Sequence, residues 1–271
     1  MKIVSFNVNS VRLRLPQLEA LVKAHDPDIV GLQETKCVDA DFPVEALEAM
    51  GFHCAFAGQK THYGVGMLSK TPMRDVQIGF RTDDADAQKR LITATIDSPR
   101  GNPITIVNGY FPQGEKRDHP VKFPAKEKFY ADLQSKLETE HSATDLLAVI
   151  GDFNIAPVDQ DLGIGPDNVK RWLRQGATSF LPEERQWFER LCAWGLDDSY
   201  RVKYPDKDDR FSWFDYRSKG FDRDPKRGLR IDHLLCTRIM TPTLIDSGID
   251  YDIRAMEKPS DHCPVWSEFE I

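Results

Sequence analysis

Eight short runs of apolar, mostly β-branched residues constrain the fold of this chain more than any other feature of its sequence. They occupy residues 3–8, 28–32, 64–68, 91–96, 104–110, 146–150, 229–236 and 263–269. Runs of this length and composition predict β-strands. Segments with helical spacing lie between several of the runs, at residues 15–24, 44–50, 125–140, 169–175 and 182–194. Together the two patterns predict an α/β protein.

The order of these elements argues against a simple doubly wound parallel sheet. The runs between residues 64 and 110 follow one another without a helix, whereas neighbouring parallel strands need a long crossover connection. Mixed or paired sheets with helices outside them are therefore expected. Gly and Pro are dispersed and no repeat or long linker interrupts the 271 residues, so we expect a single domain over residues 1–271.

The apolar runs and the cysteines indicate where in the cell the protein is located. The longest apolar run is far too short for a membrane span, and the run before Asn7 is too brief for a secretory signal. Five widely spaced cysteines form no C-x-x-C pair, which is typical of reduced thiols rather than of a zinc site or a disulfide framework. We therefore expect a soluble, cytoplasmic protein with no membrane partner.

The distribution of charge is more informative than the net charge of −7. An acidic total argues against a protein that coats nucleic acid nonspecifically, because backbone binding depends on clustered Lys and Arg. Residues 210–230, however, contain seven basic residues and three acidic ones. We interpret that stretch as a candidate phosphate-facing surface. For the cationic group Lys170, Arg171 and Arg174, a solvated helix face is the simpler interpretation.

Many of the predicted strands are bounded by acidic, amide or histidine residues rather than by generic turn residues. These are Asn7, Asn9, Gln33, Glu34, Asp152, Asn154, Asp232, Asp261 and His262. Such side chains can converge on one rim, but each also has a structural explanation. Asp152 and Asn154 can satisfy turn backbone groups, Glu34 can be a solvent-facing charge, and a lone His262 is more often structural. Asp232 inside an apolar run is harder to explain, because a buried carboxylate must be paired.

The joint occurrence of these residues favours a common site, because they stand in short motifs in a fixed order. The motifs are Asn7-Val8-Asn9, Leu32-Gln33-Glu34-Thr35-Lys36, Gly109-Tyr110-Phe111-Pro112, Gly151-Asp152-Phe153-Asn154, Arg230-Ile231-Asp232 and Ser260-Asp261-His262. In this order they resemble the bacterial exonuclease III type of abasic-site endonuclease. Residues 109–124, 210–221 and 257–262 resemble it over longer stretches, and the likeness extends from Met1 to the last predicted strand.

The resemblance implies the fold and reaction of the endonuclease/exonuclease/phosphatase superfamily. The implied fold is a four-layer α/β sandwich, in which two mixed β-sheets pack face to face with helices outside. The implied reaction is metal-dependent hydrolysis of the phosphodiester 5' to abasic sites in double-stranded DNA, with 3'-to-5' exonuclease and 3'-phosphatase or 3'-phosphodiesterase activity. The implied cofactor is Mg²⁺, with Mn²⁺ as the alternative, because the ligands are oxygen donors. The resemblance also implies a monomer.

The roles of individual residues follow from the same resemblance. The implied metal ligands are Glu34, Asn7, Asp261, Asp152 and Asn154. Asp152 is similar to the family residue that orients or deprotonates the attacking water, and Asn154 to one that positions it. His262 would donate to a phosphoryl oxygen, with Asp232 fixing its tautomer. Tyr110 would contact the phosphate or protonate the leaving oxygen, and the division of proton transfers between Asp152 and Tyr110 stays open.

The resemblance also implies contacts with DNA that carries abasic sites or blocked 3' ends. An abasic nucleotide lacks a stacked base, so an enzyme can extrude it at low cost. Trp213 and Phe214 resemble the pocket and wedge aromatics of the family, and Leu229 occupies a matching apolar position, although such a segment taken alone is more often core. Further DNA-binding candidates are Arg90, Gln113, Lys122 and Asn9, for whose charged members a solvated surface is the competing interpretation.

Two other functions compete with this hypothesis. A phosphodiesterase or phosphatase of the superfamily that acts on lipid or inositol headgroups would have much the same metal and histidine site. The stretch at residues 109–124 and the Trp213-Phe214 segment argue against it. A nucleic-acid binding module that has lost catalysis is disfavoured because the acidic, amide and histidine residues are all intact.

Overall fold

The computed structural model describes all residues from 1 to 271 and contains two six-stranded sheets. In spatial order, the first sheet consists of β11 (Leu244–Ile249), β12 (Val265–Phe269), β1 (Lys2–Asn7), β2 (Ile29–Gln33), β4 (Val65–Ser69) and β3 (His53–Ala57). The second consists of β5 (Arg74–Ile78), β6 (Leu91–Asp97), β7 (Pro103–Tyr110), β8 (Leu147–Asp152), β10 (Asp232–Thr237) and β9 (Leu196–Asp198). The pairs β1–β2 and β7–β8 are parallel, and the other neighbouring pairs are antiparallel.

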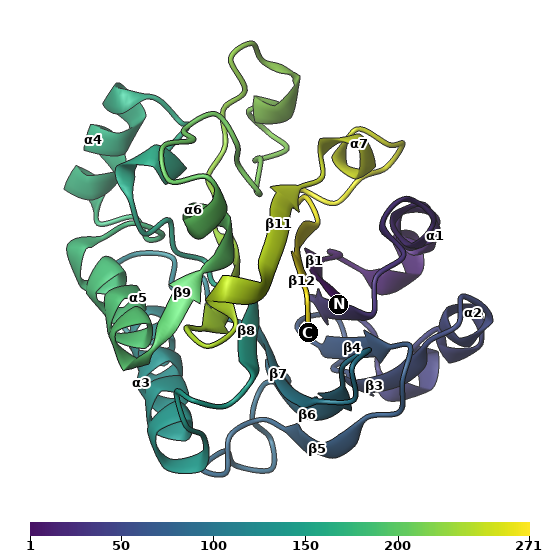
Figure 1. Cartoon of the computed structure of the whole chain (residues 1–271). Coiled ribbons are helices and arrows are strands. Elements are labelled where there is room, and N and C mark those ends of the chain that lie inside the picture. Colours follow the sequence, from purple (N-terminus) through teal and green to yellow (C-terminus); the bar gives the residue numbers. More distant parts are fainter.

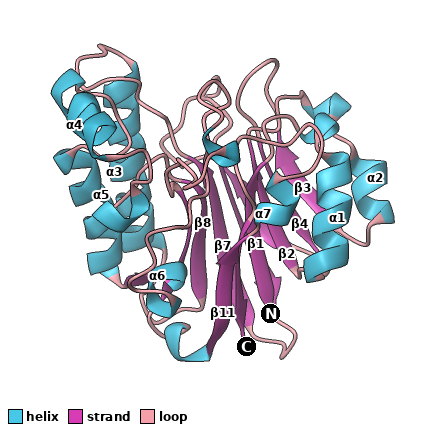
Figure 2. Cartoon of the chain, turned by 90° about the horizontal axis from the view of Figure 1, so that it is seen from above, coloured by secondary structure: helices cyan, strands magenta, loops and turns pink.

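Helices cover the outer face of each sheet and complete four layers (Figure 1). The helices are α1 (Leu15–His25), α2 (Val44–Ala49), α3 (Lys122–Glu140), α4 (Pro166–Gln175), α5 (Pro182–Trp194), α6 (Ser199–Lys203) and α7 (Tyr251–Arg254). Helices α1 and α2 lie on the side of the first sheet, whereas α3 and α5 lie on the side of the second (Figure 2). None of these helices combines the length and the apolar character that crossing a membrane requires.

Three apolar clusters hold the layers together. The central cluster joins the inner faces of the two sheets, for example Ile3 and Ile29 of the first to Ile106 and Ile150 of the second. A second cluster packs α3 and α5 against the outer face of the second sheet, and a third packs α1 and α2 against the first. Because residues on a strand alternate between faces, each sheet can supply two of these cores. Continuous burial along β2, β4, β8 and β10 reflects this arrangement.

The polar ends of the strands gather at one end of the sandwich. The carboxyl ends of β1, β2, β7 and β8 lie beside the amino ends of the antiparallel β10 and β12, as the pairing registers show. Figure 2 shows long loops gathered at the end of the sheets opposite to the two chain termini. This is the end to which those strands direct their polar residues.

The predicted fold is confirmed, with differences at the margins. All eight predicted strands and all five predicted helices are present, most with bounds within one to three residues. The run at residues 229–236 becomes a strand only from Asp232, because Leu229 instead forms isolated bridges with Leu162 and Trp213. The sequence did not predict β3, β5, β9 and β11, nor the short helices α6 and α7.

Candidate active site

Three of the predicted catalytic residues lie opposite one another on adjacent strands. Tyr110 ends β7, Asp152 ends β8 and Asp232 begins β10. In the sheet register, Asp152 pairs with Tyr110 on one side and with Asp232 on the other. Strand register therefore places two carboxylates and a phenol in a row, without any contribution from loops.

The backbone before Asp152 allows only glycine. Gly151 has φ 146°, and a β-carbon at this position would lie 1.9 Å from the carbonyl oxygen of Gly109 on the neighbouring strand. Any side chain would push β7 and β8 apart. The Gly109-Tyr110 and Gly151-Asp152 pairs thus keep the two strands, and the functional residues that follow each glycine, close together.

Asp152 is the centre of a hydrogen-bond network, and its side chain is almost completely buried. Its Oδ2 accepts from the Asn7 side-chain amide at 2.9 Å, and its Oδ1 accepts from the backbone N–H of Asn154 at 3.0 Å. His262 Nε2 lies 3.8 Å from the same Oδ2. Burial raises the pKa of Asp152, and His262 and Asn7 only partly oppose that rise. A carboxylate with a raised pKa is a stronger base once it is ionised.

His262 and Asp232 form a buried pair directly beside Asp152. His262 Nδ1 lies 2.9 Å from Asp232 Oδ2, which also accepts from the Ser212 hydroxyl at 2.6 Å. Burial alone would lower the pKa of His262, but the carboxylates of Asp232 and Asp152 outweigh it and raise the pKa. The ring is therefore held as an imidazolium. With Nδ1–H donating to Asp232, the Nε2 proton is directed towards Asp152 and the open site.

A second group of oxygen donors adjoins this network. Lys36 Nζ lies 2.8 Å from Glu34 Oε1 and donates to the Asn9 side-chain oxygen at 2.6 Å. The Asn9 amide in turn donates to Asp261 Oδ1 at 2.8 Å, and the Asn9 backbone N–H donates to Asn7 Oδ1 at 3.0 Å. An ion pair and three hydrogen bonds therefore connect Glu34 through Lys36 and Asn9 to Asp261 and Asn7.

This second group fits a hard divalent cation. Its donors are carboxylate and amide oxygens, which suit Mg²⁺ or Mn²⁺ better than zinc. It already holds one cation, the ammonium of Lys36, between Glu34 and Asn9. Asp152, Asp232 and His262 also lie close enough together to be a possible metal cluster. His262 Nδ1 is already paired with Asp232, so we interpret these two residues as a proton-carrying pair, whereas Asp152 and Asn154 stay predicted metal ligands.

Tyr110 is packed against Arg90 at the edge of the site. The Arg90 guanidinium lies between the rings of Tyr63 and Tyr110, 4.3 and 4.7 Å from their centroids, and donates to the Tyr110 carbonyl at 3.0 Å. Burial and the nearby carboxylates of Glu34 and Asp152 raise the pKa of Tyr110 well above its usual value. Its hydroxyl therefore stays protonated and can donate a hydrogen bond. Sequence reasoning did not identify Tyr63.

The aromatic segment at residues 211–214 runs beside the segment that carries His262. Trp213 forms an isolated bridge with His262, and its indole N–H donates to Asp261 Oδ2 at 3.1 Å. Phe214 and Leu229 are fully buried. The structure thus brings Trp213 to the site directly, whereas contact between DNA and Phe214 or Leu229 stays a prediction.

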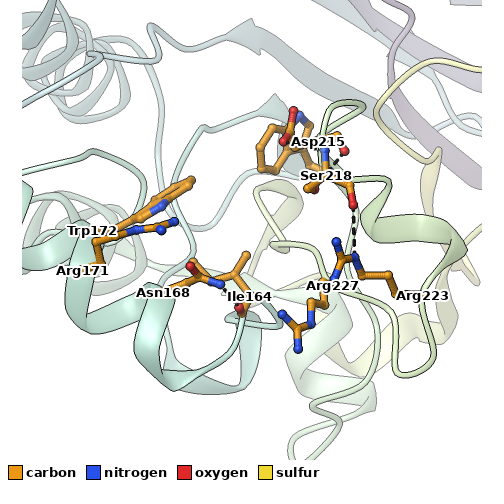
Figure 3. Close-up of a pocket in the computed structure, with 9 residues that line it drawn as sticks. Ile164, Asn168, Arg171, Trp172, Asp215, Ser218, Arg223 and Arg227 are labelled. Atoms are coloured by element: carbon orange, nitrogen blue, oxygen red, sulfur yellow. Dashed lines mark hydrogen bonds between the residues drawn. The ribbon is translucent and has the colours of Figure 1, made fainter.

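A pocket of about 260 Å³ lies beside Trp213 (Figure 3). Its lining includes Trp172 and Arg171 from α4 on one side, and Arg223 and Arg227 from the basic stretch at residues 210–230 on the other. Arg171 therefore faces this pocket, although sequence reasoning favoured a solvated helix face for it. Trp172 was not identified at all, because a tryptophan at helical spacing is usually a core residue.

The basic stretch at residues 210–230 does not face solvent as a unit. Arg230 is only 1% exposed, and its guanidinium donates to Asp161 at 2.7 Å and to Asp198 at 2.6 Å. The prediction of a phosphate-facing surface is wrong for this residue, because its donors are already bound by two buried carboxylates. Other candidates are also engaged: the Gln113 amide donates to Thr178, and Lys122 pairs with Glu115 at 2.6 Å.

Comparison with known proteins identifies the family to which this site belongs. Residues 4–262 match the model of the Endonuclease/Exonuclease/phosphatase family. The chain belongs to the Endonuclease/Exonuclease/phosphatase family. It is 54% identical over 270 residues to exodeoxyribonuclease III of Haemophilus influenzae, and this alignment covers all of both chains.

Solved structures of this family share the whole fold. An AP endonuclease from Archaeoglobus fulgidus has a TM-score of 0.91 at 31% identity, with complete coverage of both chains. A 3' phosphatase from Neisseria, solved with a product DNA hairpin, has a TM-score of 0.89 at 40% identity, again with complete coverage. The resemblance to the exonuclease III type, the four-layer fold and the assignment as an enzyme are thereby confirmed.

Proposed function

We propose that this chain hydrolyses the DNA backbone on the 5' side of abasic sites and also removes nucleotides or blocking groups from 3' ends, with a divalent cation. The observation that supports this most directly is the placement of the buried Asp152 between two kinds of group. His262 Nε2 lies 3.8 Å from Asp152 Oδ2. The side-chain amide of Asn7, which belongs to the group of oxygen donors with Glu34, donates to the same oxygen at 2.9 Å. Hydrolysis of a phosphodiester needs a base for water and positive charge for the phosphoryl oxygens, and this site supplies both.

In the proposed mechanism Asp152 orients the attacking water and accepts its proton. The Asn7 amide and the Asn154 backbone N–H each donate to one of its carboxylate oxygens. They fix the direction of the carboxylate, and the raised pKa makes it a suitable acceptor near neutral pH. The Asn154 side chain is held by its own donation to the Phe111 carbonyl at 3.0 Å, and it would keep water and phosphate in register.

Two groups would supply positive charge to neutralise the phosphoryl oxygens. His262 Nε2–H donates to a phosphoryl oxygen, and Asp232 maintains both the orientation and the protonation of the ring. A divalent cation held by Glu34, Asp261 and Asn7, with Asp152 and Asn154 as further predicted ligands, would supply Lewis-acid polarisation of the phosphate. We propose Mg²⁺ for this position, with Mn²⁺ as the alternative.

Tyr110 completes the site as a hydrogen-bond donor. Its phenol keeps its proton, since burial and the nearby Glu34 and Asp152 carboxylates raise its pKa. It can therefore donate to the phosphate or to the leaving oxygen. Asp152 is the better water activator because it is the group that ionises near neutral pH.

Recognition of the abasic nucleotide would depend on Trp213. Its indole N–H bonds to Asp261, which ties an aromatic wall to the predicted metal ligands. An extruded sugar without a base could be admitted beside this wall, whereas a normal nucleotide would have to be unstacked first. Arg90, Asn9 and the arginines around the adjacent pocket would contact DNA phosphates. Such contacts position the protein on the duplex without recognising the base sequence.

Nicking of a defined duplex tests this proposal. A duplex with one synthetic abasic site, an intact duplex and a soluble inositol phosphate are incubated separately with the protein in Mg²⁺. The proposal predicts nicking of the abasic duplex alone, and its loss on chelation or in D152N. Hydrolysis of the inositol phosphate with the DNA intact would favour the headgroup phosphatase. Tight DNA binding with no metal-dependent nicking would favour the binding module.

Three further properties belong to the same proposal. We propose that residues 1–271 act as a single domain, which agrees with a core shared by both sheets. We also propose a monomer in the cytoplasm. All five cysteines are free, as is usual for proteins of a reducing compartment.

A further inference from the structure

A fully buried lysine lies directly behind the catalytic loop. The Lys126 side chain, on α3, has no exposed surface. Its ammonium donates to the carbonyl of Asn154 at 2.9 Å and to that of Gln113 at 3.3 Å. Sequence reasoning did not identify this role, because a lysine in an amphipathic helix normally faces solvent.

Helix α3 donates hydrogen bonds to two consecutive backbone carbonyls in the loop that follows Asp152. Lys126 bonds to the Asn154 carbonyl, and Tyr130, one helical turn later, donates its hydroxyl to the Phe153 carbonyl at 2.7 Å. Residues four apart lie on the same helix face, so both donors point the same way. Asn154 itself has φ 53°, a left-handed conformation that other residues rarely adopt. The loop conformation is thus held from behind by α3.

Glu184 balances the charge of Lys126. The two side chains are both completely buried, with 2.5 Å between Lys126 Nζ and Glu184 Oε1. The other oxygen of Glu184 accepts from the backbone N–H of Leu181, at the start of α5. Three segments therefore meet at one ion pair: α3, the beginning of α5 and the loop with Asn154.

Stability alone does not explain this ion pair. Replacing a buried ion pair with apolar residues of similar volume is often neutral or stabilising, because desolvation offsets the Coulomb attraction. What the Lys126–Glu184 pair does determine is the position of the Asn154 main chain, through the bond from Lys126 to the Asn154 carbonyl. That position in turn aims the Asn154 side chain, and it aims the backbone N–H that donates to Asp152.

We propose that Lys126 is a positioning residue for the reaction. It holds the main chain of Asn154, and through it the Asp152 carboxylate, in the arrangement that hydrolysis requires. Glu184 is the ion-pair partner of Lys126, and Tyr130 reinforces the neighbouring carbonyl. This inference rests on the proposed function of Asp152 and Asn154, but it concerns a residue that touches neither substrate nor metal.

The test compares two buried lysines of the same helix. The double variant K126M/E184Q removes both charges, and its glutamine can still accept from Leu181. The control is K136M, because the Lys136 ammonium is also buried but bonds to Gln77 and Glu140 instead. Glu140 keeps Arg81 as a partner in that control. Y130F removes a single hydroxyl and keeps both charges.

We expect K126M/E184Q to lower kcat on the abasic duplex by up to about 100-fold, as misplacement of a catalytic group by a distant change can do. KM should change far less, and Y130F should show a smaller fall in kcat. K136M should retain the wild-type kcat. Adding N154A to K126M/E184Q should cost little further activity, because both changes act through the same residue.

Two outcomes would overturn the positioning role. The first is a wild-type kcat in both K126M/E184Q and Y130F. The second is an equal loss of kcat in K136M, which would indicate general destabilisation. If K126M/E184Q does not fold, the comparison of Y130F with wild type and K136M decides between the same outcomes.

A readout without activity separates this inference from the proposed function. In ¹⁵N-labelled protein, the side-chain amide resonance of Asn154 should shift in K126M/E184Q and in Y130F but not in K136M. An unshifted resonance would overturn the positioning role even if the wild type nicks abasic DNA. Absence of nicking by the wild type, with the shift present, would overturn the proposed function and leave the link from Lys126 to Asn154 supported.

Discussion

Two charge clusters lie within a few residues of each other in this chain, and each shifts the pKa of one aspartate, in opposite directions. In the first, which we call the structural cluster, the carboxylates of Asp161 and Asp198 face the guanidinium groups of Arg230 and Arg201. In the catalytic cluster, Asp152 and Asp232 share a single cation, His262. Arg230 of the structural cluster and Asp232 of the catalytic cluster are separated in the chain only by Ile231.

The charged neighbours of each aspartate, rather than its burial, determine whether its pKa is raised or lowered. Asp152 is buried and the Asp198 side chain is only 9% exposed, and burial by itself raises the pKa of each. Arg230 and His233 reverse this for Asp198 and lower its pKa far below the usual value. For Asp152, the His262 charge is partly cancelled by Asp232 and Glu34, so the pKa stays raised. One cluster keeps permanent charges in place, whereas the other can exchange a proton.

The largest expected effect is that of D152N on turnover. Removing a general base lowers rates by about 10²- to 10⁴-fold, so kcat on the abasic duplex should fall by that amount. The midpoint of thermal unfolding should not fall, because a buried carboxylate with a raised pKa does not stabilise the fold. The matching substitution in the structural cluster is D198N. If D152N lowered the unfolding midpoint as much as D198N does, Asp152 would belong with the structural cluster.

Breaking the structural cluster should lower the stability of the fold, which D152N should leave intact. R230M leaves Asp161 and Asp198 buried without this partner, and loss of one member of a buried ion pair costs about 3–5 kcal/mol. Urea unfolding should report this loss. The matched control is R238M, whose exposed pair with Asp197 should contribute at most about 1 kcal/mol. Equal losses in the two variants would contradict the account of the structural cluster.

The two aspartates should also respond to pH in opposite directions. Asp198 has a lowered folded pKa, so its stabilisation is complete above the unfolded value of about 3.9 and is lost as pH falls through the folded value. Asp152 has a raised folded pKa, so it destabilises the fold progressively as pH rises from about 3.9 to that value. Urea unfolding of wild type, D198N and D152N at a series of pH values measures both trends.

The rate should follow the ionisation of Asp152. Turnover should rise with pH over a range above the ordinary aspartate value, because the carboxylate must lose its proton before it can accept one from water. A pH profile of kcat for nicking checks this. A rate that has already reached its plateau near the ordinary aspartate pKa would contradict the raised pKa of Asp152.

The smallest expected effect is on substrate choice. W213A removes the aromatic wall and the donor to Asp261 but no carboxylate. Discrimination between abasic and intact duplexes should fall by about the value of one stacking contact, 1–3 kcal/mol. Metal affinity, measured by Mn²⁺ titration, should change less. Equal losses of both would show that Trp213 supports the oxygen donors rather than the nucleotide.

The sequence predicted the catalytic cluster better than the structural one. Asp152 follows one apolar run, Asp232 lies inside another and His262 directly precedes a third. Strand register pairs Asp152 with Asp232, and an isolated bridge with Trp213 holds the segment of His262. Arg230 lies in the same stretch, but its burial depends on Asp161 and Asp198, which are distant in sequence and give no local signal. Lys126 was missed for the same reason.

The strands that the sequence did not predict are short or at sheet edges. β5 is largely exposed and has a register irregularity, and β9 contains only three residues. Such strands lack a continuous apolar run, and pairing with a neighbour stabilises them more than their own composition does. Strand prediction therefore succeeded for the inner strands, which also position the site.

Mapping the ends produced at an abasic site tests the central claim most directly. An end-labelled duplex with one natural abasic site is incubated with the protein in Mg²⁺, and the new termini are identified. Hydrolysis by water activated at Asp152 predicts a cut on the 5' side with a 3'-hydroxyl terminus. A cut on the 3' side by elimination, or a cut of the same rate in D152N, would contradict the account.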